Sequence, residues 1–98
     1  MIERLHSGDF SEHVHTDFKV KVEGKDLLVL ELVEVVDHKS PPGVEQFSLL
    51  FRGPSQLGQG MRTVEHDKLG SLDLFLVPVG ADGEGVRYEA AFARYRES

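Results

Sequence analysis

The chain has 98 residues, of which 40% are hydrophobic and 29% are charged, values that fit one globular domain over residues 1–98 and argue against disorder. It contains no cysteine, which excludes disulfides, zinc–thiolate sites and thiol nucleophiles and favours a reducing compartment. The net charge is −6, with 11 Lys and Arg scattered among 17 Asp and Glu, so a nucleic-acid partner is not expected.

The hydrophobic pattern does not direct the chain to a membrane. Residues 1–6 lack a basic stretch followed by an apolar one, so we expect no signal peptide. The longest apolar runs, Leu27–Leu30 and Leu74–Val77, are far shorter than the roughly 20 residues of a membrane helix. We therefore expect a protein that is cytoplasmic, or delivered by a specialised route, with no membrane partner.

The first expected element is a short helix over Ser7–Val14. Ser7 can cap the free amides at its start, and Phe10 and Val14 share a face at a spacing of i, i+4. Helices this short are rarely stable alone. We expect this one to plug an open end of a sheet.

From Asp17 onward the apolar residues recur every second position, which is typical of strands with one buried face. Turn-forming residues separate the runs, notably at Gly24–Asp26, Asp37–Gly43, Gly53–Gly60 and Ala81–Gly85. The pattern predicts six strands, of which the fourth is a short strand over Met61–His66. The apolar faces of the other five are Phe18, Val20 and Val22; Leu28, Leu30 and Leu32; Phe47, Leu49 and Phe51; Leu72, Leu74 and Leu76; and Val86, Tyr88, Ala90 and Phe92.

Within the second predicted strand, the apolar alternation slips by one residue near Leu32 and Val33. A slip of this kind indicates a β-bulge, which bends a strand at a barrel corner. The alternative is a strand buried on both faces, which Glu31 and Glu34 make less favourable.

Together these elements predict an all-β domain: a small six-stranded antiparallel barrel, or a barrel-like sandwich, with one short N-terminal helix. Closure into a barrel would protect the strand edges that an open sheet exposes.

Several segments carry a resemblance to a known family. They are Asp9-Phe10, Phe47–Pro54, Val64–His66 with Leu69-Gly70, Leu74–Gly80 and Tyr88–Ala90. The chain resembles a bacterial family of about one hundred residues classed as a domain of unknown function. The resemblance implies genes near those of phage tail-collar-like proteins, and so a part in a phage-tail-like assembly, but it implies no enzymatic activity. Arg62, where an aromatic is usual, and His6, where a capping Thr is, depart from the family's pattern.

Histidines are the first candidates for a functional site. His13 and His15 would project from the same face of an extended segment. A further ligand, either His38 or His66 or a carboxylate such as Asp17 or Glu65, could complete a metal site. Without such a partner, they are surface histidines, which is the interpretation we favour. No spacing in the chain matches a known zinc motif.

A second candidate is the run Glu65-His66-Asp67, which could act as an acid–base group with Ser48 or Ser71 as a nucleophile. No G-x-S-x-G nucleophile elbow is present. We favour the alternative in which the carboxylates are solvated beside a turn and His66 caps backbone groups. We therefore expect no catalytic residues, no enzyme activity and no cofactor.

Arg52 is expected to form a structural ion pair with Glu31, Glu34 or Glu65 rather than to anchor a ligand.

Phe75 lies on the opposite parity to the inward leucines of its strand, together with Val77, and Leu50 does the same on its own strand. Apolar residues on an outer face need a second covering.

We predict a non-catalytic interaction or structural module whose contact face is Leu50, Phe75 and Val77, working with a protein partner or by self-association in a homo-oligomer. The alternative is a small-ligand or metal-binding barrel that uses His13 and His15, with the Ser55–Gly60 loop at its mouth.

Overall fold

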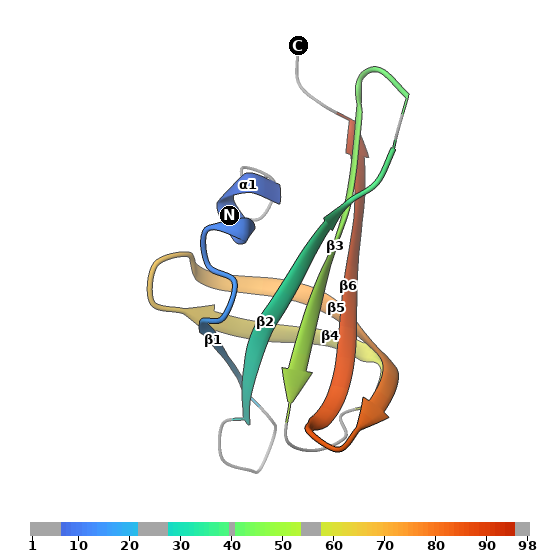
Figure 1. Ribbon diagram of the computed structural model, residues 1–98. Coiled ribbons are helices and arrows are strands. Elements are labelled where there is room, and N and C mark those ends of the chain that lie inside the picture. The colour runs from blue at the N-terminus through green and yellow to red at the C-terminus, as the bar shows by residue number, and fades with distance from the viewer. Residues whose placement is uncertain (1–6, 22–27, 40, 54–57, 96–98) are drawn as a thin grey trace.

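The computed structural model describes residues 7–21, 28–39, 41–53 and 58–95. These residues form one short helix and six strands (Figure 1). The elements are α1 (Ser7–Ser11), β1 (Asp17–Val20), β2 (Leu28–Asp37), β3 (Val44–Gly53), β4 (Gly60–His66), β5 (Gly70–Asp82) and β6 (Gly85–Tyr95). No described helix has the length and apolar character needed to cross a membrane.

Every strand pair is antiparallel, and the order β1-β2-β3-β6-β5-β4 returns to β1. The ring closes through a short pairing of β1 with β4, in which Lys19 lies opposite Glu65 and Val20 opposite Val64. Figure 1 shows β2, β3 and β6 running along the length of the molecule, while β4 and most of β5 cross them before β5 curves round to meet β6. The predicted all-β, six-stranded, barrel-like fold with one short helix is confirmed.

The interior is made by the apolar residues of alternate positions, as the period of two requires. On β3, for example, Phe47, Leu49 and Phe51 are fully buried. The buried apolar residues form one cluster: Phe10, Phe18, Val20, Leu30, Leu32, Phe47, Leu49, Phe51, Val64, Leu72, Leu74, Leu76, Tyr88 and Ala90.

Helix α1 contributes Phe10 to this interior. The Phe10 ring lies 5.9 Å from that of Phe47 and 6.1 Å from that of Phe92, centroid to centroid, and Phe10 is fully buried. Val14 follows the helix and packs against the same cluster. Because a five-residue helix cannot hold itself together, these contacts stabilise it. The prediction that the helix plugs an end of the sheet is confirmed, although its regular part ends at Ser11.

Two irregularities bend the strands. The register of β2 against β3 shifts between Leu32 and Glu34, which confirms the bulge predicted from the slip in the hydrophobic pattern. A second shift lies between Pro78 and Gly80 in β5, where β5 pairs with β6. This bulge was not predicted, because Pro78 stands where the strand was expected to end.

The predicted Ala81–Gly85 loop is wrong in its extent. Strand β5 continues to Asp82 and β6 begins at Gly85, so the turn consists of Gly83 and Glu84. The Asp82 carboxylate accepts the Glu84 amide at 2.8 Å, and Gly85 adopts a φ of 142°, which a residue with a side chain rarely does. The predicted Gly24–Asp26 turn and Val22 lie outside the described residues.

Candidate functional site

The predicted contact residues lie on the outer face of the ring. Leu50 of β3 and Val77 of β5 are both register partners of Glu89 in the strand between them, β6. Residues opposite one another across a sheet project from the same face. Leu50 and Val77 therefore flank Glu89 on one face, and both are partly exposed.

Phe75 continues this face along β5. It is 48% exposed and pairs across the sheet with Met61 of β4, which is 65% exposed. On β5, Phe75 lies between Leu74 and Leu76, which point inward and are buried. Two large apolar side chains thus lie side by side in solvent at the point where the neighbouring positions supply the core.

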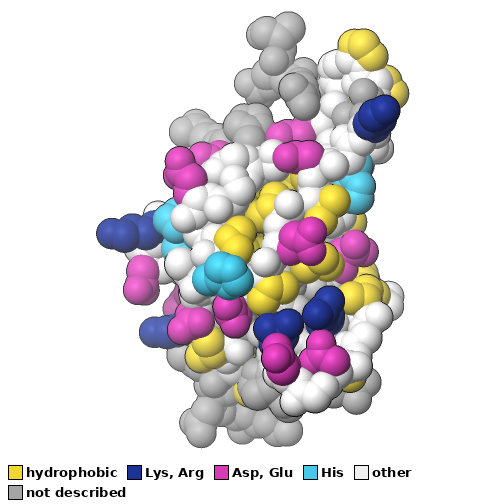
Figure 2. All heavy atoms as spheres, viewed as in Figure 1, with side chains coloured by type: hydrophobic (Ala, Val, Ile, Leu, Met, Phe, Trp, Pro, Cys, Tyr) yellow, Lys and Arg dark blue, Asp and Glu magenta, His cyan; other side chains and the backbone are white. Residues whose placement is uncertain are grey.

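Carboxylates accompany the apolar residues. Glu34 of β2 is the register partner of Leu50 on the side opposite Glu89. The order of residues across four strands is thus Glu34, Leu50, Glu89, Val77. Figure 2 shows hydrophobic side chains gathered in the middle of the view, over β2 and β3, with acidic side chains beside them.

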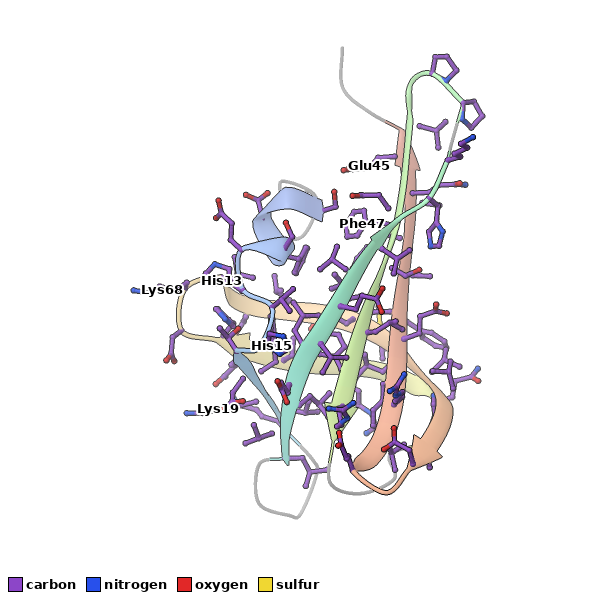
Figure 3. All side chains as sticks on the ribbon, in the orientation of Figure 1. His13, His15, Lys19, Glu45, Phe47 and Lys68 are labelled. Carbon is purple, nitrogen blue, oxygen red and sulfur yellow. The ribbon has the colours of Figure 1, made fainter. Side chains whose placement is uncertain are left out.

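The histidines proposed as metal ligands do not converge. His13 and His15 lie in a turn after α1, not in an extended segment, and His15 has a φ of 70°. His15 Nδ1 lies 3.0 Å from Glu31 Oε2, whereas the ring of His13 faces that of His66 at 4.6 Å between centroids. In Figure 3, His13 lies near Lys68 and His15 lies lower, beside β2. The described residues contain no group of three or more His, Cys, Asp or Glu that could hold a metal ion.

His66 is the most constrained of the described histidines. It is 8% exposed at the end of β4, and its Nδ1 accepts the backbone amides of Lys68 at 3.0 Å and Leu69 at 3.1 Å. Its Nε2 lies 2.9 Å from Thr16 Oγ1. Both ring nitrogens are therefore engaged, and burial lowers the pKa of His66, with the neighbouring His13 lowering it further. The interpretation of His66 as a backbone cap is confirmed.

Neither proposed nucleophile is among the described hydrogen-bond partners of His66. Ser48 is 3% exposed, and its Oγ lies 2.8 Å from Nε2 of His38, so its partner is a different histidine. Ser71 is an exposed residue opposite Glu65. Glu65 itself pairs with Lys21 at 3.4 Å. The groups proposed for acid–base catalysis, His66, Glu65 and Ser48, thus each have a different partner.

Arg52 does form an ion pair, but not with any of the three predicted carboxylates. Its guanidinium lies 3.2 Å from Glu84 in the β5–β6 turn. Arg87, its register partner on β6, pairs with Asp82 at 3.4 Å. A backbone hydrogen bond from Glu84, followed by the two arginines, lowers the pKa of Asp82. The prediction failed because the extended β5 strand carries the turn beside Arg52, which local spacing does not show.

A family model described as a domain of unknown function, DUF6916, matches residues 5–92. The chain belongs to this family. The DUF6916 match takes in α1, all of β1 to β5 and β6 as far as Phe92, so the family covers the complete ring described above. Comparisons with curated proteins and with solved structures give no match. The resemblance to a domain-of-unknown-function family is confirmed at that level.

Met61 and the two flanking glutamates, Glu34 and Glu89, were not predicted as members of the outer face. A signal for Met61 was present, because it shares strand parity with Thr63 and Glu65, the polar positions of β4. Glu34 and Glu89 could not be assigned from spacing alone. Their place beside Leu50 depends on the bulge in β2 and on the order of strands around the ring.

Proposed function

We propose that this DUF6916 protein is a non-catalytic protein-interaction module whose contact surface is the outer face defined by Leu50, Phe75, Val77 and Met61. The observation that carries the proposal is the pair Phe75 and Met61, which are 48% and 65% exposed on adjacent strands. The strands that carry these side chains also supply the core, so their backbone is ordered before a partner covers them. Contiguous exposed apolar surface of this kind marks interaction sites.

The carboxylates bear on the nature of the partner. Glu34 and Glu89 flank Leu50, and the whole chain has a net charge of −6. A partner surface that offers an apolar centre with Lys or Arg at its rim would complement this arrangement. Such a surface can belong to a second copy of the chain, through Arg52 and Arg87, or to another protein.

The wider setting is part of the same proposal. The resemblance described above associates the family with bacteria and with tail-collar-like neighbours, and this supports a component of, or an accessory to, a phage-tail-like assembly. A cytoplasmic location would fit the absence of cysteine from the chain.

His13 and His15 are not proposed to bind a metal, because each already has another partner. His15 has Glu31 as its partner, and His13 packs against a histidine whose two ring nitrogens already have hydrogen bonds.

The proposal is tested by measuring mass in solution by light scattering for the wild type and for Phe75→Glu. Self-association predicts a wild-type mass that is a multiple of 11.0 kDa, and a variant of 11.0 kDa with an unchanged circular dichroism spectrum. If the wild type is a monomer, the same pair of proteins is used in quantitative pull-downs from the native host, and the variant should lose the recovered partner.

Val29→Glu provides the matched control. Val29 is 41% exposed, but it belongs to β2, which lies across the ring from β5. This substitution should leave both association and partner recovery unchanged. Unfolding of Phe75→Glu would place Phe75 in the core, and equal losses in both variants would remove the outer face as the contact.

A further inference from the structure

The segment between α1 and β1, residues 12–16, is attached to the ring of strands on two sides. On one side, backbone hydrogen bonds join it to β2: His15 donates its amide to the Leu32 carbonyl at 2.6 Å, and Leu32 donates to the Thr16 carbonyl at 3.1 Å. On the other side, the only described hydrogen bond to the end of β4 runs between the side chains of Thr16 and His66, 50 residues apart in the sequence. The second fastening therefore depends on one imidazole ring.

The hydrogen bonds of His66 determine where its proton lies. Because Nδ1 accepts two backbone amides, from Lys68 and Leu69, the proton of the neutral ring must be on Nε2. Nε2–H then donates to Thr16 Oγ1, and the Thr16 hydroxyl donates to the carbonyl of His13 at 2.5 Å. Every donor in this series of hydrogen bonds has an acceptor. The arrangement is complete only for the neutral ring in this one tautomer.

A second proton would go to Nδ1, which faces two N–H donors. An N–H cannot accept a hydrogen bond, so the ring must turn away from the Lys68 and Leu69 amides, and this turn withdraws Nε2 from Thr16. We propose that His66 is a pH-sensitive latch: the neutral imidazole holds residues 12–16, the turn between α1 and β1, against the end of β4, and its protonation releases this turn from β4. The latch goes beyond the contact face and does not depend on it.

The surroundings of His66 oppose protonation on balance. From the segment after α1, the ring of His13 lies 4.6 Å away, and from the turn after β4, Lys68 adds positive charge. Asp67 in the same turn acts in the opposite direction and favours the proton. The ring of Phe18, from β1, covers His66 at 4.5 Å and carries no charge. Burial is the largest influence, and together these groups lower the pKa of His66 below 6.5.

The sign of the pH dependence follows from this direction. The unfolded or released segment leaves His66 with an ordinary pKa near 6.5, whereas the latched state binds its proton less readily. The contribution of the latch is complete above pH 6.5 and is lost as the pH falls through the lowered pKa of the latched state. Acidification should therefore loosen the turn between α1 and β1 before it unfolds the strands.

The experiment is a pH titration of the whole protein by NMR, with side-chain nitrogen spectra for the tautomer and amide hydrogen exchange for the release. Above pH 7, His66 should be neutral with its proton on Nε2. As the pH falls from 6.5 to the lowered pKa of His66, exchange of the His15 amide, corrected for its intrinsic rate, should rise about tenfold for each pH unit, while the Leu49 amide of β3 stays protected. Below that pKa, the amides of Lys68 and Leu69 should have shifted.

Three substitutions test separate parts of the latch. His13→Asn removes the neighbouring charge and should move the midpoint of the His66 titration to higher pH, whereas His15→Asn, two residues away beside Glu31, should leave that midpoint unchanged. Thr16→Val removes the hydroxyl and should make amide exchange in the turn between α1 and β1 fast at every pH.

The latch is overturned if His66 carries its proton on Nδ1 above pH 7, or if it titrates at or above pH 6.5. It is also overturned if the corrected exchange rate of the His15 amide, in the turn between α1 and β1, is the same above and below the titration of His66. These measurements use the wild type, so they decide the matter even if a variant fails to fold.

Discussion

The inner and outer faces of the ring use the same kind of residue for opposite purposes. Phe47 on β3 is fully buried, and its ring lies 4.7 Å from that of Phe92 and 5.9 Å from that of Phe10. Phe75 on β5 is 48% exposed, with Met61 as its cross-strand neighbour. Strand parity alone separates them. An aromatic on the inner parity stabilises the fold, and one on the outer parity remains available to a partner.

The largest expected effect tests the inner face. Phe47→Ala removes the ring that joins α1 to β3 and β6 and leaves a cavity, so the free energy of unfolding should fall by about 3–5 kcal/mol. Chemical denaturation monitored by circular dichroism measures the change. A loss below about 1 kcal/mol would mean that the aromatic cluster contributes little, and that the two faces differ less than their burial suggests.

The next largest effect is expected from substitution of a glycine that packs against the core. Gly53 ends β3, and a Cβ there would meet the Cδ2 atom of Leu30 and approach Cε2 of Tyr88 to 3.4 Å. Leu30 and Tyr88 are fully buried and cannot move aside freely. Gly53→Ala should therefore destabilise the protein by about 1–3 kcal/mol through overpacking.

Gly80→Ala is the matched control for Gly53→Ala. Gly80 is exposed in β5, and a Cβ added to it would have no heavy atom within 4 Å. Its substitution should change the free energy of unfolding by less than about 0.5 kcal/mol. Equal effects at Gly53 and Gly80 in the same denaturation series would show that packing around Gly53 is looser than its neighbours indicate.

Much of the fold could be predicted from local pattern. The alternation of Phe47, Leu49 and Phe51 identified β3, and the slip at Leu32 identified the bulge, because side-chain parity is a property of neighbouring residues. Partners across the ring could not be predicted in the same way. The Arg52–Glu84 pair depends on how far β5 extends before its turn, and nothing in the spacing of charges determines that length.

The candidate sites divide along the same line. The outward parity of Phe75 follows from its own strand, so the sequence predicted it directly. The His66 network joins Thr16 to the end of β4, and that contact exists only because β1 closes the ring against β4. A closure between distant strands leaves no periodic signal. The local cap formed by His66 could therefore be predicted from the sequence, whereas the hydrogen bonds that continue through Thr16 could not.

A smaller effect is expected from a polar pair on the outer face. Thr63 donates its hydroxyl to the Asp73 carboxylate at 2.8 Å, and the two residues are register partners on β4 and β5. Asp73→Ala should cost about 0.2–1 kcal/mol, the usual range for a cross-strand pair. A double-mutant cycle with Thr63→Val isolates the coupling, and a coupling energy of zero would show that water replaces this hydrogen bond without loss.

The smallest effect should come from the residues that the outer face exposes most. Met61→Ser and Phe75→Ser remove apolar surface that already contacts water, so each should change the free energy of unfolding by no more than about 0.5 kcal/mol. Denaturation at low protein concentration, where association does not contribute, makes the measurement. A loss above about 1 kcal/mol from either substitution would mean that these side chains stabilise the folded chain itself. A near-zero change, combined with lost association, would show that the exposed apolar pair serves binding rather than folding.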